Sequence, residues 1–364
     1  FADLMFQTAG GGNFLRLTDI DGLATNEGRV GHTPVGFSDL DGDGLDDLVL
    51  KAPSGAHIVQ FAADNANSDN IGRGQHTVLG FVDIDGDGVD EAIAIRDNPN
   101  NARVGILDDN FQTLVNQPIT DQTLAGFGDF NGDGIDDALL ESANGGKRIL
   151  SSTDLVLVNQ SRFITSAIAD FTGDGIDDVL GLHEITDDFS LLLGDAVNPL
   201  ANTQLLGLEG HEAVAVLKAD FGSTADLLMH DTLTDDFVLL TDGLTTSTQL
   251  NVAGDTFEAI GDFNGDGIDD VLLRMSNDNG RILFSADRST ATVIPEIDGK
   301  TVSDIGDFDG DGADDILLKD DATGAFSVYS GLTGEITELD ASLDDADVVD
   351  PNGLDTLGVL NDFA

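Results

Sequence analysis

A nine-residue pattern of aspartate and glycine recurs along the chain at a nearly constant spacing. The first full copy reads Asp39-Leu40-Asp41-Gly42-Asp43-Gly44-Leu45-Asp46-Asp47. Five further full copies start at Asp83, Asp129, Asp170, Asp262 and Asp307, and two degenerate copies start at Asp220 and Asp350. The eight starts are separated by 44, 46, 41, 50, 42, 45 and 43 residues. A period of this length, kept over nearly the whole chain, indicates one supersecondary unit repeated in series.

The segments between the copies have the pattern of β-strands. Each copy runs into a short apolar stretch, such as residues 48–50 or 271–273, and a turn rich in Gly, Asn, Asp or Pro separates it from a second apolar stretch. Short apolar runs bounded by turn residues are typical of buried strands in hairpins. About 20 residues remain before the next copy, which is enough for two more strands. No segment shows a helical period over three turns.

A four-stranded unit of about 44 residues, repeated in series, predicts an all-β fold in which each repeat forms one blade of a β-propeller. We expect a single propeller domain that spans residues 1–364. Nine copies of the strand that follows the motif, from Leu4 to Leu357, enclose eight intervals. The count favours eight blades, one of them completed by strands from both ends of the chain, and leaves seven blades as the alternative.

Each full copy carries oxygen ligands at alternate positions. Positions one, five and nine are acidic and position three is Asp, Asn or Thr, while glycine at position six allows a sharp backbone turn. Ca²⁺ takes about six to eight oxygen ligands, and a short loop can supply them in this way, with the carbonyl group of position seven as a further ligand. The predicted ligands are, in chain order, Asp39, Asp41, Asp43, Leu45 and Asp47; Asp83, Asp85, Asp87, Val89 and Glu91; Asp129, Asn131, Asp133, Ile135 and Asp137; Asp170, Thr172, Asp174, Ile176 and Asp178; Asp262, Asn264, Asp266, Ile268 and Asp270; and Asp307, Asp309, Asp311, Ala313 and Asp315.

Six copies in phase predict about six Ca²⁺ sites, with the metal stabilising the blades. The pattern differs from an EF-hand, because position twelve carries no acid and lies inside a predicted strand. Carboxylates crowded into nine residues repel one another unless a cation lies between them. We expect a weaker site at Asp170, because Thr172 is a poorer ligand, and no calcium at the degenerate copies that start at Asp220 and Asp350. Position eight is expected to face away from the metal or to hydrogen-bond the loop.

In the first repeat, Gly36-Phe37, the loop 39–47 and Lys51-Ala52-Pro53 follow one another in the order that the name FG-GAP describes. On these residues the repeats resemble FG-GAP/VCBS repeats, the units of the calcium-binding propellers of integrin α-subunits and of many secreted bacterial proteins. The resemblance covers nearly the whole chain and is weakest near residues 185–260 and beyond residue 340. It implies a propeller in which each calcium loop lies between two blade strands and partners bind to loops elsewhere.

The charge of the chain restricts its partners. The chain has 69 acidic and 15 basic residues and a formal net charge of −54. Nucleic acids and anionic membranes are bound through Lys and Arg, so this composition disfavours both. No apolar run approaches the roughly 20 residues needed for membrane insertion, and no cysteine is present for a disulfide, a zinc site or a thiol nucleophile. The first residue is Phe1, which we interpret as the start of a processed or excised part of a longer product.

The remaining residues favour a binding or structural module over an enzyme. The six histidines are scattered without zinc-ligand spacing or a nucleophile–base order, and the cations form no cluster that could neutralise an acidic sugar. The chain has no Trp and a single Tyr, Tyr329, which disfavours sugar binding by stacking. Most phenylalanines recur at repeat positions and are expected in the core, namely Phe37, Phe81, Phe130, Phe171, Phe221, Phe263 and Phe308.

We therefore expect an extracellular calcium-binding propeller that binds a protein or glycan ligand, or that serves as a structural module, in a secreted or cell-surface protein. Loops of this kind match the millimolar calcium outside cells. Two alternatives stay open on the same fold. One is a polysaccharide-active, lyase-like enzyme, and the other is a calcium-dependent carbohydrate-binding protein.

Overall fold

The computed structural model describes residues 4–8, 12–17, 24–43, 45–61, 68–72, 76–96, 103–107, 113–119, 122–152, 155–158, 162–285, 291–344 and 346–349. These residues form four-stranded antiparallel sheets, with two short 3-10 helices, η1 (Pro295–Ile297) and η2 (Ala341–Leu343), and no α-helix among them. They fall into two compact units. The middle unit is His32–Gly210, and the terminal unit combines the segment that ends at Gly31 with the segment that begins at His211.

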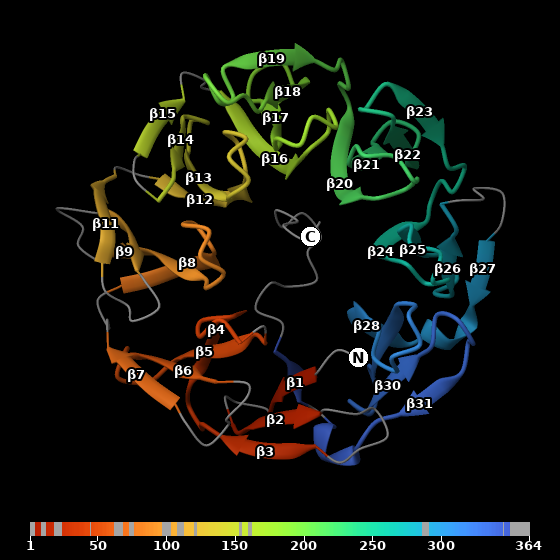
Figure 1. Cartoon of the computed structure of the whole chain (residues 1–364). Helices are drawn as coiled ribbons and strands as arrows, with labels where there is room; N and C mark the ends of the chain where they lie inside the picture. The colour runs from red at the N-terminus through yellow and green to blue at the C-terminus, as the bar shows by residue number, and fades with distance from the viewer. Residues whose placement is uncertain are drawn as a thin grey trace. The chain divides into compact units, whose positions relative to one another are not determined.

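The middle unit contains four sheets, each of which takes its strands in chain order (Figure 1). They are β4 (Thr33–Ser38), β5 (Asp47–Lys51), β6 (His57–Gln60) and β7 (Ser68–Gly72); β8 (His76–Val82), β9 (Glu91–Arg96), β10 (Arg103–Leu107) and β11 (Thr113–Pro118); β12 (Gln122–Gly128), β13 (Asp137–Ser142), β14 (Lys147–Leu150) and β15 (Leu155–Val158); and β16 (Phe163–Ala169), β17 (Asp178–His183), β18 (Phe189–Leu193) and β19 (Asn202–Leu205).

The terminal unit also contains four sheets, and the last of them joins the two ends of the described chain. They are β20 (His211–Leu217), β21 (Asp226–Asp231), β22 (Asp236–Thr241) and β23 (Thr246–Gln249); β24 (Thr256–Gly261), β25 (Asp270–Arg274), β26 (Gly280–Leu283) and β27 (Ala291–Ile294); β28 (Lys300–Gly306), β29 (Asp315–Asp320), β30 (Phe326–Tyr329) and β31 (Ile336–Glu338); and β1 (Leu4–Gln7), β2 (Phe14–Leu17), β3 (Thr25–Gly28) and β32 (Asp347–Val348). In this last sheet β1 pairs with β32, with Phe6 opposite Val348 and Gln7 opposite Asp347.

The fold class predicted from the repeat is confirmed, because each repeat forms one four-stranded blade of a β-propeller. There are eight blades rather than seven, and one blade draws its strands from both ends of the chain, as expected. The described part of the chain holds no helix that is long and apolar enough to cross a bilayer.

The hydrophobic core lies between consecutive sheets of a unit. In one cluster Phe130 and Leu139 of one blade are buried together with Ile168 and Val179 of the next blade. The second strand of each such blade is therefore covered on both faces, which explains why residues such as 138–140 form a continuous apolar run instead of alternating.

The glycine that precedes phenylalanine in the first strands has a packing reason. A Cβ atom on Gly36 would lie 2.6 Å from Cε2 of Phe81, and one on Gly80 would lie 2.8 Å from Cε2 of Phe127. Real Cβ atoms do not approach other atoms so closely, so each glycine makes room for the phenylalanine of the following blade. The Gly-Phe pairs of the repeat thus set how closely the first strands of neighbouring blades approach.

Candidate calcium loops

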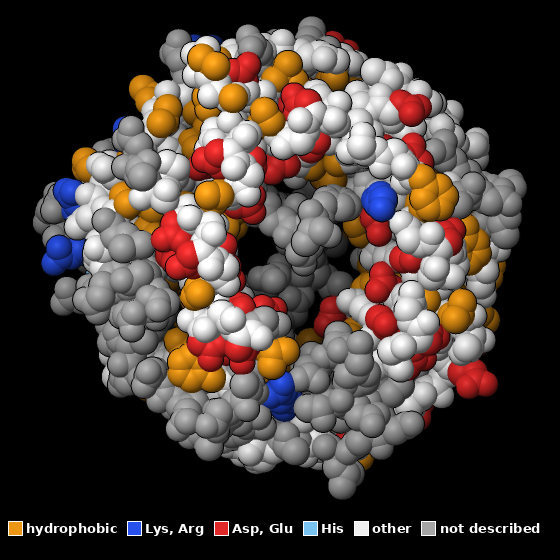
Figure 2. Space-filling view, in the orientation of Figure 1, with side chains coloured by type: hydrophobic (Ala, Val, Ile, Leu, Met, Phe, Trp, Pro, Cys, Tyr) orange, Lys and Arg blue, Asp and Glu red, His pale blue; other side chains and the backbone are white. Residues whose placement is uncertain are grey.

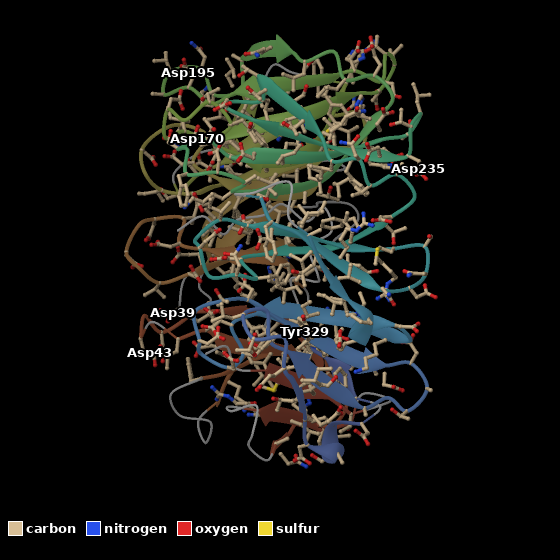
Figure 3. The ribbon with its side chains drawn as sticks, turned by 90° about the vertical axis from the view of Figure 1, so that its right-hand side faces the viewer. Asp39, Asp43, Asp170, Asp195, Asp235 and Tyr329 are labelled. Carbon is tan, nitrogen blue, oxygen red and sulfur yellow. The ribbon has the colours of Figure 1, made fainter. Side chains whose placement is uncertain are left out.

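Each of the six intact motifs forms the loop between the first and the second strand of its blade. The loops at one end of the strands in the middle unit carry Asp39, Asp43, Asp170 and Asp195 (Figure 3). Acidic side chains gather in separate groups on the face shown in Figure 2. The repeat therefore places acidic side chains at the same end of the strands in successive blades.

The aspartate at position one organises its loop from within. Asp129 Oδ1 accepts hydrogen bonds from the backbone N–H groups of Gly132 (2.6 Å) and Asp133 (3.2 Å), and Asp129 Oδ2 accepts one from Gly134 (2.8 Å). Gly132 and Gly134 have φ angles of 74° and 83°, in the left-handed region that favours glycine. Asp170 makes the same three contacts in the next blade. The motif glycines are thus required for the backbone to wrap around the first carboxylate.

In three loops the structure brings three carboxylates together, with one oxygen from each lying within 4.8 Å of the others. The groups are Asp39, Asp41 and Asp43; Asp83, Asp85 and Glu91; and Asp307, Asp309 and Asp311. Oxygen-only clusters of this kind are the donor set that Ca²⁺ prefers. The residues present therefore fit a bound calcium ion.

The other intact loops have a neutral residue at position three. Asn131 Nδ2 donates to Asp137 Oδ2 (2.8 Å), and Asn264 Nδ2 donates to Asp270 Oδ2 (3.1 Å). In the loop with Thr172, the backbone N–H of that residue donates to Asp178 Oδ2 (3.1 Å). Positions three and nine are thus in contact in all three loops, through the side chain of position three in two of them and through its backbone in the third.

Position nine is the first residue of the second strand, and its carboxylate is buried. Asp47, Asp270 and Asp315 are fully buried. Backbone N–H groups hold this carboxylate from two sides, because Asp315 Oδ2 accepts from Phe308 (3.0 Å) and Asp315 Oδ1 accepts from Gly331 (3.1 Å). Among the three carboxylate groups of the described residues, only that of the second loop includes position nine, as Glu91. Asp47 and Asp315 lie outside the groups of their own loops.

Burial and the neighbouring carboxylates act together on position nine. Burial, together with the charges of Asp85 and Asp87, raises the pKa of Glu91 to about 8. Burial likewise raises the pKa values of Asp137, Asp178 and Asp270 to about 7 and that of Asp315 to about 6. A cation in the loop would offset the repulsion and favour the ionised form.

Position eight has a function that sequence reasoning did not find. Asp177 Oδ2 accepts a hydrogen bond from the backbone N–H of Asp129 (2.8 Å), and the N–H of Asp177 donates to the carbonyl oxygen of Asp129 (2.9 Å). Asp314 and Asp262 form the same pair, at 2.7 Å and 2.8 Å. We call this reciprocal pair the interblade clasp, because it joins position eight of one loop to position one of the loop before it.

One further blade forms the complete clasp, and another forms it in part. Asp269 Oδ2 accepts from the N–H of Lys218 (2.6 Å), and its own N–H donates to the Lys218 carbonyl (2.9 Å). The N–H of Asp90 donates to the carbonyl of Asp39 (3.0 Å), while Asp90 Oδ2 accepts from the hydroxyl of Ser38 (2.6 Å). Position eight was expected to face away from the metal or to hydrogen-bond its own loop, and in these blades its carboxylate bonds the preceding loop instead of its own. The invariant acid at position eight was the signal for this role.

Position seven was predicted to supply a carbonyl ligand, and its side chain also contacts the preceding loop. A Cβ atom on Gly132 would lie 2.7 Å from Cδ1 of Ile176, and one on Gly86 would lie 2.7 Å from Cδ1 of Ile135. The glycine at position four is therefore needed for a second reason besides its positive φ. Successive loops are stacked on one another as well as clasped.

The degenerate loop of the terminal unit begins two residues earlier than predicted. In the β20–β21 pair Leu217 lies opposite Asp226, as Gly128 lies opposite Asp137 in an intact blade. Position one is therefore Lys218, and position nine is Asp226. The prediction that the loop starts at Asp220 was wrong, because it matched an Asp-Phe pair instead of counting back from the buried acid.

This shift also corrects one predicted core residue. Phe221 occupies position four, where intact loops have glycine, and its side chain is 76% exposed. By contrast, the phenylalanines at position two are buried: Phe130, Phe171, Phe263 and Phe308. Phe37 and Phe81 are partly buried. Gly44 and the degenerate copy that starts at Asp350 lie outside the described residues.

Two of the histidines contact residues of the turn that follows their strand. His183 Nδ1 accepts from the backbone N–H of Thr186 (3.3 Å), and His230 Nε2 lies 3.1 Å from Asp235 Oδ1. Both histidines lie in the second strands, β17 and β21, next to the turn that follows. Their places are similar but not equivalent, because His183 lies five residues after Asp178 and His230 four residues after Asp226, so the counterpart of His183 is Asp231.

The comparisons with known proteins show a similarity of fold alone. A scan of protein-family models and a search of curated proteins found no match. Among solved structures, the dihydro-heme d1 dehydrogenase NirN in complex with DHE is 11% identical, over 95% of this chain and 74% of that chain, with a TM-score of 0.58. AztD of Citrobacter koseri is 11% identical, over 95% and 96% of the two chains, with a TM-score of 0.51. Prolyl oligopeptidase B of Galerina marginata is 10% identical, over 88% and 52%, with a TM-score of 0.50. These proteins differ in function, so the likeness concerns the propeller fold alone.

Proposed function

We propose that this chain is an extracellular calcium-binding propeller of the FG-GAP/VCBS type, which serves as an adhesion or ligand-binding module or as a structural module of a secreted or cell-surface protein. The observation that carries the proposal is the recurrence of three clustered carboxylates at the same edge of separate blades. When bound, Ca²⁺ would neutralise these groups and tie together the ends of the first and second strands. The metal is structural in this proposal, and the ligand is a protein or a glycan.

The surroundings of the loops support calcium as the ion and the outside of the cell as the location. The ligand atoms are carboxylate, amide, hydroxyl and carbonyl oxygens, which suit a hard cation. Several of these side chains are exposed, for example Asp41 and Asp43, so sites of modest affinity are expected. Such sites fill at millimolar calcium and stay empty at cytosolic levels.

No observation favours the lyase-like alternative over a binding module. An enzyme that acts on acidic sugars needs cations for the substrate carboxylate, and the best-placed cations are engaged in the fold. Lys147 is fully buried and forms a salt bridge with Glu141. Arg274 pairs with Glu258 at 2.5 Å. Tyr329, the single tyrosine, is 6% exposed and belongs to the core, so it provides no stacking surface.

A retention experiment tests the ligand-binding part of the proposal. The protein is passed over immobilised acidic polysaccharides, neutral polysaccharides and matrix proteins, in calcium, in magnesium and in chelator, and the appearance of new chain ends is followed in the same samples. We expect retention in calcium alone, without cleavage. New chain ends that accumulate with turnover would instead establish an enzyme and refute the binding-module proposal.

Rebuilding the degenerate loop is expected to create an additional calcium site. The substitutions Lys218→Asp, Phe221→Gly, Gly222→Asp and Ser223→Gly restore the missing ligands and glycines around the buried Asp226. Equilibrium dialysis with metal analysis should find one more calcium per chain than in the wild type. The same variant with Asp226→Asn is the control and should return to the wild-type number. A folded rebuilt protein that binds no extra calcium would contradict the assignment of these positions.

A further inference from the structure

The interblade clasp acts on the residue that supplies the first ligand of a loop. Asp177 fixes both the N–H and the carbonyl group of Asp129. The side chain of Asp129 in turn accepts from Gly132 and Gly134 of its own loop. Any displacement of Asp177 therefore moves the backbone from which the first carboxylate of the preceding loop projects.

Asp177, at the other end of the clasp, is held in place by its neighbours in loop 170–178. Asp177 precedes Asp178, whose carboxylate accepts from the N–H groups of Thr172 (3.1 Å) and Gly194 (2.9 Å). Ile176, on the other side, contacts the position-four glycine of the preceding loop. Ile176, Asp177 and Asp178 thus connect the conformation of loop 170–178 to that of the preceding loop, 129–137.

Two glycines leave room for the carboxylates of the clasp. A Cβ atom on Gly128 would lie 2.8 Å from Asp177 Oδ2, and one on Gly261 would lie 3.0 Å from Asp314 Oδ2. These two glycines end the first strands of their blades, directly before position one. A larger residue there would push the clasp carboxylate away, so the approach depends on glycine.

We propose that the position-eight carboxylate is a positioning residue for the calcium loop of the preceding blade, so that calcium binds cooperatively to consecutive loops of one unit. The inference rests on the proposed calcium binding. An ion bound by Asp170 and its loop holds Asp177 and Asp178 in place. The clasp then holds Asp129 in position before an ion reaches its own loop, which lowers the ordering cost of binding there.

The test uses a readout that resolves individual loops. Hydrogen exchange with mass spectrometry follows peptides that cover residues 129–137 and 170–178 over a calcium titration of the whole chain. In Asp177→Ala the calcium midpoint for 129–137 should rise at least about fivefold, the low end of typical coupling between sites. The midpoint for 170–178 should also rise, by no more than the same factor, because coupling between two binding sites is reciprocal.

Three further variants keep the test decisive. Asp177→Asn retains an oxygen acceptor for the Asp129 N–H and should restore most of the affinity of loop 129–137. Asp195→Ala removes an exposed carboxylate from the same edge without touching the clasp and should leave both midpoints unchanged. Asp314→Ala repeats the experiment in the terminal unit, on loop 262–270, and decides the question if Asp177→Ala does not fold.

The outcomes separate this inference from the function on which it rests. If the wild type shows no calcium-dependent protection in any loop, both proposals are wrong. If calcium protects the loops but Asp177→Ala leaves the midpoint of 129–137 unchanged, or shifts only that of 170–178, the clasp does not position the preceding loop. Linkage also requires reciprocity, so Asp170→Ala should weaken loop 129–137, and Asp129→Ala should weaken loop 170–178 by the same factor.

Discussion

Removal of calcium is expected to lower the melting temperature of the middle unit by on the order of 10–20 °C. Four of the six intact loops lie in this unit, those that start at Asp39, Asp83, Asp129 and Asp170. A ligand at ten times its dissociation constant stabilises the folded state by about 1.4 kcal/mol per site. Four sites then contribute about 6 kcal/mol, and a domain of this size shifts by roughly 2–4 °C per kcal/mol.

The terminal unit has two intact loops, which start at Asp262 and Asp307, so its shift should be about half as large. Scanning calorimetry in calcium and in chelator measures both effects. Because the chain carries a net charge of −54, the chelator sample needs monovalent salt at matched ionic strength, which screens general repulsion without filling the loops. An identical melting profile in calcium and in chelator would refute the structural role of the metal.

Replacing the buried lysine of the middle unit is expected to destabilise it by about 3–5 kcal/mol, the usual cost of leaving one partner of a buried ion pair alone. Lys147 has no exposed side-chain surface, and its ammonium contacts the Glu141 carboxylate and the carbonyl oxygen of Phe163 in the next blade (2.6 Å). Glu141 Oε2 also accepts from the N–H (2.9 Å) and the hydroxyl (2.6 Å) of Thr165. Lys147→Met keeps the aliphatic stem but leaves Glu141 without its cation.

Chemical denaturation of matched variants checks this prediction. Arg148→Met alters the next residue of the same strand, whose guanidinium reaches only the Pro118 carbonyl at an exposed site, and should cost less than about 1 kcal/mol. Adding Glu141→Gln to Lys147→Met removes the uncompensated charge and should recover part of the loss. If Lys147→Met is no worse than Arg148→Met, the buried pair does not hold these two blades together.

The sequence predicted the parts of this structure that depend on equivalence between repeats. The period favoured eight blades over seven and placed every intact loop between a first and a second strand, because residues at the same phase adopt the same local conformation. A period does not indicate which neighbour a residue contacts. The clasp between Asp177 and Asp129 was therefore missed, although the acid at position eight was visible in every intact copy.

The errors in the degenerate blade have a related cause. Matching the Asp220-Phe221 pair to the start of the motif placed Phe221 in the core, whereas the strand register makes Lys218 the first residue of the loop. Counting back eight residues from Asp226, the buried acid that starts the second strand, would have given the correct start, Lys218. The buried residue is the better marker, because packing constrains it more than ligand chemistry constrains an exposed loop.

The short strand β32 determines when the sheet of β1, β2 and β3 can be completed during synthesis. It completes the sheet of β1, β2 and β3 through only two paired residues, Asp347 and Val348. Among the described residues, the middle unit takes all its strands from residues 32–210, so we expect these strands to pair while synthesis continues. The three N-terminal strands must wait until residues 29–346 have been added, which takes tens of seconds at about 5–20 residues per second. During that time β1 exposes an unpaired edge, and the nascent chain is most vulnerable to pairing with the wrong strand.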